Sequence, residues 1–157
     1  SETSDEEIVD TESNASETQE EATWAATLSA VERSLAQRGL AAAVHLAVES
    51  IGGQFQETVP LFDDDQQEWV ATARAVNATT GRELFQGIGH STAKRPARRT
   101  AYCQVLSYAV CQIAVSQVKS NPTLDWDEDI TLSKSHPMLH DRLRDLLQAA
   151  ARGRVAR

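Results

Sequence analysis

Three segments with strand character follow one another between residues 54 and 88, and the connections between them are too short for a crossover. The segments are residues 54–61, 69–76 and 82–88, and turn-forming residues separate them at 63–67 and 77–81. Strands joined by so few residues pair antiparallel, because a parallel pair needs a connection of a dozen residues or more. The sequence therefore predicts a three-stranded antiparallel meander.

Helical spacing of apolar residues flanks this meander on both sides. The spacing predicts four helices, at residues 24–38, 41–51, 93–120 and 137–151. Gly39 is placed to cap the first helix, and Pro96 fixes the start of the third, since proline is tolerated only in the first turn. The order of elements is that of an α+β domain with its helices on one face of a small sheet.

The formal net charge of −8 is distributed unevenly along the chain. Residues 1–21 hold nine carboxylates and no basic side chain, so residues 22–157 carry a net charge of +1. With so few apolar residues, residues 1–21 are expected to be a disordered acidic tail. The expected organisation after the tail is an extra helix (22–39), one α+β domain (40–119) and an extension with a last helix (120–157).

Membrane-spanning and secreted classes are not expected. No run of about 18 apolar residues is present, and the acidic N-terminus lacks the basic and apolar character of a secretory signal. Cys103 and Cys111 lie eight positions apart on one predicted helix, about 12 Å, which is beyond disulfide reach. A cytoplasmic or nuclear protein with free thiols is expected.

The sequence predicts neither an enzyme nor a metal or cofactor site. His136 and His140 have the spacing of a helical metal pair, but Pro137 places His136 at or before the helix start, and no third ligand follows. No nucleophile motif or phosphate-cradling lysine motif occurs in the chain.

A cluster of cations opens the third predicted helix. Residues 82–119 carry a local net charge of +5, and four of their six cations are Lys94, Arg95, Arg98 and Arg99. Cations at a helix N-terminus are disfavoured by the helix dipole and by their mutual repulsion, and a phosphate backbone would relieve both. The preceding Gly87-Ile88-Gly89 is expected to be a turn whose free amides also suit an anion. The alternative is a solvated basic face balanced by the acidic tail.

Residues 41–113 resemble the double-stranded RNA-binding domain (dsRBD) family, whose order is α-β-β-β-α. In that family a Gly-x-Gly turn ends the third strand, and the second helix opens with Lys-Lys-x-x-Lys followed by small alanines. Gly87-Ile88-Gly89 matches the turn, Lys94, Arg95 and Arg98 match the triplet, and Ala97 and Ala101 match the small positions.

The resemblance implies sequence-independent recognition of A-form RNA, with the basic helix start on the phosphates and the first helix and first hairpin loop in two minor grooves. It implies phosphate contacts for Lys94, Arg95, Arg98 and Arg99, supported by His90. It also implies a minor-groove position for His45, and Glu49 is the nearest counterpart of the glutamate on the family's first helix.

Two features differ from the family pattern and keep a second function open. The first hairpin loop is Asp63-Asp64-Asp65-Gln66-Gln67 instead of a Gly-Pro-x-His type, and two extra residues precede Lys94. The alternative function is a protein-binding or dimerisation module with little RNA affinity. The apolar stripes of the outer helices would then hold the partner, whereas in the simpler interpretation these stripes extend the core.

Overall fold

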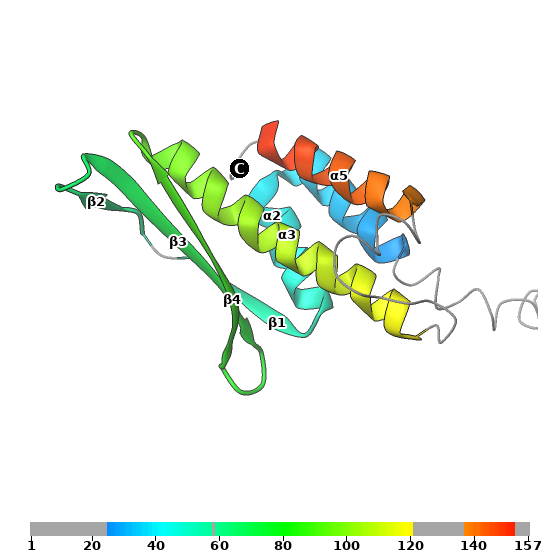
Figure 1. Cartoon of the computed structure of the whole chain (residues 1–157). Coiled ribbons are helices and arrows are strands. Elements are labelled where there is room, and N and C mark those ends of the chain that lie inside the picture. Colours follow the sequence, from blue (N-terminus) through cyan, green and yellow to red (C-terminus); the bar gives the residue numbers. More distant parts are fainter. Residues whose placement is uncertain (1–24, 58, 121–136, 153–157) are drawn as a thin grey trace, which may run out of the picture.

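The computed structural model describes residues 25–57, 59–120 and 137–152. A helix over residues 25–38 is followed by α2 (Leu40–Ser50), four strands, α3 (Lys94–Ser120) and α5 (Pro137–Arg152). The strands are β1 (Gly53–Glu57), β2 (Leu61–Asp63), β3 (Glu68–Asn77) and β4 (Glu83–Ser91). Every strand pairing is antiparallel, and the helices lie on one side of the sheet (Figure 1). The chain is therefore an α+β protein.

The sheet has four strands where three were predicted. β3 lies at the centre, with β4 along one edge and both β1 and β2 along the other. The predicted strand 54–61 is thus divided, because its pairing with β3 stops after Glu57 and resumes at Leu61. Pro60 lies in the gap, and a proline has no N–H to donate to the neighbouring strand.

The core fills the space between the sheet and helices α2 and α3. Its buried side chains include Ala71, Ala73 and Ala75 of β3, which alternate with residues on the open face. Phe55 of β1 and Tyr102 of α3 pack edge to face, with ring centroids 5.1 Å apart. Small residues in the sheet bring α3 close to the strands and so fix where its first turns lie.

The predicted turn at Gly87-Ile88-Gly89 is wrong, because these residues are part of strand β4. They pair with Ala73, Thr72 and Ala71 of β3. Gly87 and Gly89 are buried beneath α3, and a Cβ on Gly89 would collide with the carbonyl oxygen of Ala97. Here glycine allows close packing of a helix on a strand instead of a change in chain direction.

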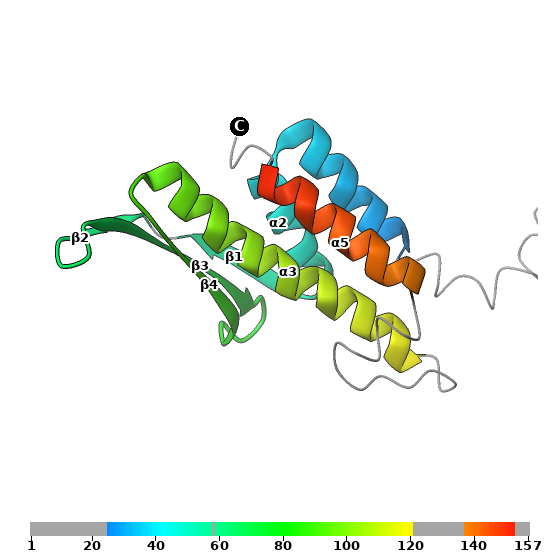
Figure 2. The ribbon, with the colours of Figure 1, turned by 45° about the horizontal axis from the view of Figure 1, so that its top comes forward.

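The two outer helices pack against the core. Leu28 and Val31 of the first helix are buried, as are Leu143 and Leu146 of α5. Figure 2 shows α5 beside both the first helix and α3. The apolar side chains named here are therefore covered within the chain and offer no surface to a partner.

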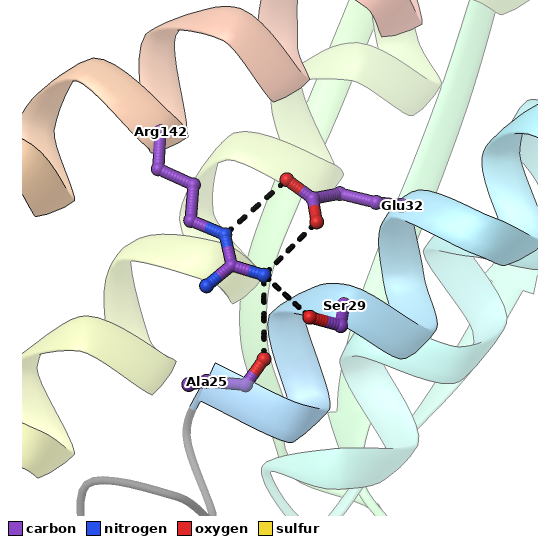
Figure 3. Close-up of polar contacts among 4 residues, drawn as sticks. All are labelled: Ala25, Ser29, Glu32 and Arg142. Carbon is purple, nitrogen blue, oxygen red and sulfur yellow. Dashed lines mark hydrogen bonds and ion pairs between the residues drawn. The ribbon is translucent and has the colours of Figure 1, made fainter.

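Arg142 links α5 to the first helix (Figure 3). Its guanidinium donates to both carboxylate oxygens of Glu32, at 3.0 and 3.3 Å, and to the Ser29 hydroxyl at 2.6 Å. A longer bond of 3.4 Å reaches the carbonyl oxygen of Ala25. This polar contact joins residues more than 100 positions apart in the sequence.

None of the helices in the described part of the chain has the length and apolar character needed to cross a membrane.

Candidate nucleic-acid interface

Three of the predicted phosphate ligands lie together at the start of α3. Lys94, Arg95 and Arg98 line a depression of about 580 Å³, which we call the basic depression. Its other wall is formed by Glu57, Val59 and Pro60, where the strand pairing is interrupted. Pro96 lies in the first turn of α3, as its missing N–H requires, so the basic residues begin with the helix itself.

The three cations differ in how far neighbouring residues already engage them. The Lys94 ammonium lies 4.6 Å from the centroid of the Trp69 ring, within range of a cation–π contact. The Arg98 guanidinium donates to the Tyr102 hydroxyl at 3.0 Å and lies 3.5 Å from the Glu57 carboxylate. Within the described part of the chain, Arg95 makes no hydrogen bond or ion pair, and its side chain is exposed.

Among the described residues that line the basic depression, Glu57 is the one carboxylate, and it partly neutralises Arg98. The side chains of Arg98 and Glu57 are 32% and 49% exposed, so water screens their attraction. An incoming phosphate would compete with Glu57 for the same guanidinium.

His45 connects to the basic depression through aromatic rings. It is exposed on α2, and its ring lies 4.9 Å from Phe55 in an edge-to-face contact. Phe55 in turn packs edge to face on Tyr102, whose hydroxyl accepts the hydrogen bond from Arg98. Glu49 is also exposed, one turn farther along α2, so both residues are on the solvent side of that helix.

His90 and Arg99 lie apart from the three grouped cations. His90 is exposed on the open face of the sheet, where its Nδ1 is 3.8 Å from the Glu68 carboxylate. Arg99 lines a second depression of about 460 Å³, between α3 and α5. The four neighbouring basic residues therefore divide between two surfaces. At about 100° per residue, Arg99 points about 140° away from Lys94 and about 100° away from Arg98, which places it at the edge of the group nearest α5.

The Gly-x-Gly amides do not form an anion-binding loop. They belong to the backbone of β4, and the Ile88 amide donates to the Gln104 side-chain oxygen at 2.9 Å. An anion at this site would therefore contact side chains at the start of α3 and not these amides.

The loop between β2 and β3 is acidic and ordered by its own hydrogen bonds. The Asp63 carboxylate accepts from the Asp65 amide at 3.0 Å and from the Gln66 amide at 3.3 Å, as in an Asx turn. Gln67 closes the turn with a φ of +58°. Asp64 and Asp65 are fully on the surface, so the loop presents negative charge to solvent.

Cys103 lines the second depression near Arg99 and is not disulfide-bonded. Burial raises the pKa of its thiol, and the positive charge of Arg99 acts in the opposite direction. The thiol is therefore held in its neutral form at neutral pH. His136 lies outside the described residues, and within them no group of three His, Cys, Asp or Glu side chains is arranged to hold a metal ion.

Sequence reasoning missed Glu57, Trp69 and Tyr102 as parts of the site. All three come from different elements than Lys94 or from a later turn of α3, and no local spacing pairs them with the cations. Pro60 was the available signal, because a proline within a predicted strand indicates an interruption at that point.

Comparison with known proteins gives no relative: no family model matches the chain, and neither a curated protein nor a solved structure does.

Proposed function

We propose that the chain binds double-stranded or structured RNA, without catalysis and without reading its sequence. The observation that carries the proposal is the grouping of Lys94, Arg95 and Arg98 around one depression at the N-terminus of α3. Their mutual repulsion and the positive end of the helix dipole both disfavour this grouping, and a polyanion offsets both. The resemblance of residues 41–113 to the dsRBD family supports RNA as that polyanion.

The arrangement is suited to phosphates more than to base edges. Lys94 and Arg95 are both exposed. The lysine ammonium is a point charge on a flexible stem and the arginine guanidinium is a planar fork of donors, and both fit phosphate oxygens. Recognition of RNA by backbone and shape is independent of sequence, because the deep major groove of A-form RNA hides the base edges. His45 and Glu49, exposed on α2, are proposed to contact the minor groove. A cytoplasmic or nuclear location belongs to the same proposal.

The test is the salt dependence of binding to a duplex RNA of about 20 base pairs, a length that covers a dsRBD footprint. The Lys94→Ala, Arg98→Ala double variant is expected to bind at least about tenfold more weakly and to lose about two units of the slope of log K against log salt. Fluorescence anisotropy at several salt concentrations measures both quantities.

The matched control removes two other exposed cations, Arg33 and Arg38 of the first helix. This Arg33→Ala, Arg38→Ala variant has the same net charge and is expected to retain nearly all of the affinity. Equal losses of RNA affinity in both double variants would mean that only net charge determines binding. If the unmodified protein bound no duplex RNA at all, the proposal would be wrong.

A protein-binding function is the second candidate, and the open face of the sheet is the surface that favours it. Leu61, Leu84 and Ile88 are 70%, 42% and 38% exposed there, whereas the stripes of the outer helices are buried. This function predicts no measurable affinity for duplex RNA. A second copy on this face would give a dimer in light scattering, and a different partner would give a larger complex when it is added. Both measurements together separate the two functions.

A further inference from the structure

The tip of the β2–β3 hairpin carries an aromatic side chain that no helix covers. In both ribbon views the hairpin extends past the first turn of α3 (Figures 1 and 2). Phe62 of β2 pairs with Trp69 of β3 and therefore points to the same side of the sheet as α3. It remains 43% exposed, although most aromatic side chains of the described residues are at least partly buried.

Phe62, Trp69 and Lys94 form a continuous group. The rings of Phe62 and Trp69 are in edge contact, with centroids 5.2 Å apart and planes at 69°. The Lys94 ammonium lies over the same Trp69 ring. An exposed aromatic ring and a cation of the basic depression are thus neighbours across a single indole. We call Phe62 and Trp69 the aromatic shelf.

We propose that the aromatic shelf stacks an unpaired nucleobase at the end of an RNA duplex while Lys94, Arg95 and Arg98 hold the adjoining phosphates. This inference rests on the proposed function and names the class of RNA that the site prefers. Aromatic rings beside a basic surface are the combination that binds unpaired nucleotides, since every base has a π-face and every linkage a phosphate.

The acidic loop gives the reason for a duplex end instead of a continuous duplex. Asp64 and Asp65 are exposed immediately beyond Phe62, at the tip of the hairpin. A duplex that continued past the shelf would bring its phosphates against these carboxylates. A neutral base that ends on Phe62 avoids them. The same loop that opposes the interior of a duplex is therefore compatible with its end.

The two side chains of β2 allow a matched comparison. Phe62 lies on the helix side of the sheet, and its neighbour Leu61 pairs with Val70 and lies on the open face, 70% exposed. Phe62→Leu keeps an apolar side chain but removes the aromatic face. Leu61→Ala removes an apolar side chain of the same strand on the opposite side.

The experiment compares a blunt RNA duplex with the same duplex carrying one unpaired 2-aminopurine nucleotide at an end. The unmodified protein is expected to bind the overhang RNA about fivefold or more tighter than the blunt one and to quench the 2-aminopurine fluorescence. Phe62→Leu is expected to lose the preference and the quenching while binding blunt duplex as before. Leu61→Ala and Phe62→Trp are expected to retain both. Thermal unfolding of each variant checks that the fold is intact.

The outcomes separate this inference from the proposed function. Equal, salt-dependent affinity for blunt and overhang RNA, unchanged by Phe62→Leu, would overturn the stacking site and leave duplex binding in place. No affinity for either RNA would overturn both. A dimer in light scattering that Phe62→Leu abolishes, without any preference for the overhang, would assign the shelf to a protein contact and overturn the inference.

Discussion

Arg98 has two polar partners, and they affect an incoming phosphate in different ways. The Tyr102 hydroxyl accepts one hydrogen bond and orients the guanidinium without adding charge. The Glu57 carboxylate, 3.5 Å from the same nitrogen, adds a negative charge to the wall of the basic depression. At the scale of single residues, the site therefore contains both the guanidinium that is proposed to bind a phosphate and a carboxylate that would compete with the phosphate for it.

Replacing Glu57 is expected to strengthen RNA binding. Glu57→Gln removes the competing charge but keeps the size of the side chain, so affinity for duplex RNA should rise about two- to fivefold, the amount typical of an exposed ion pair. The gain should shrink at high salt, because screening weakens the repulsion that the substitution removes. Anisotropy titrations at low and high salt measure both effects.

Glu83→Gln provides the control for that prediction. Glu83 pairs with Arg74 at 3.6 Å and is similarly exposed, but it belongs to β4 and lies away from the basic depression. The substitution changes the net charge by the same amount and should leave the affinity nearly unchanged. If Glu83→Gln gave the same gain as Glu57→Gln, the effect would come from net charge and the assigned competition would be wrong.

At the scale of elements, the packing of α3 on β4 determines where the basic residues lie. Gly87 and Gly89 let the helix backbone approach the strand, with Ala97 and Ala101 facing them. The sequence pattern identified these small residues but assigned the glycines to a turn. A glycine that permits a turn and a glycine that permits close packing look the same in a sequence, and only the position of the helix distinguishes them.

The element order, by contrast, could be predicted well from periodicity and turn residues. The helices at 41–51 and 93–120 and the central strand at 69–76 agree with α2, α3 and β3 to within one residue at each end. The division of the first strand and the position of Glu57 could not be predicted, because both depend on pairing with β3 and on contact with α3. Local spacing on a single helix predicted a cluster of four cations. Three of them line the basic depression, and Arg99 lines the second depression instead.

A side chain at Gly89 is expected to separate α3 from β4. In Gly89→Ala the new methyl group would meet the Ala97 carbonyl, and the helix must shift, at a cost of about 3 kcal/mol in the free energy of unfolding. Gly52→Ala is the comparison, because Gly52 has a φ of +81° but open space around it, and its cost should be about 1 kcal/mol. Chemical denaturation measures both. A smaller decrease in the free energy of unfolding for Gly89→Ala than for Gly52→Ala would contradict the packing role of Gly89.

At the scale of the whole molecule, two kinds of basic surface have different roles. The cations at the start of α3 line a depression open to solvent, whereas Arg142 of α5 makes four hydrogen bonds to the first helix. The Arg142 contact joins α5 to the first helix over the core, and Leu143 and Leu146 of α5 are buried in that core. The outer helices thus complete the fold and leave the basic depression open to solvent.

Arg142→Met is therefore expected to lower stability without changing RNA affinity. The variant removes a two-pronged contact with Glu32 and a hydrogen bond to Ser29, which should lower the free energy of unfolding by about 1–2 kcal/mol, since the pair is partly exposed to water.

Arg144→Met is the control on the same helix, because its ion pairs with Asp141 and Asp145 are local and exposed. Its cost in the free energy of unfolding should stay below about 0.5 kcal/mol. Denaturation midpoints and RNA titrations of both variants test this division of roles. Equal stability of the two variants would show that the Arg142 contact does not hold the outer helices, and weaker RNA binding by folded Arg142→Met would show that they take part in recognition.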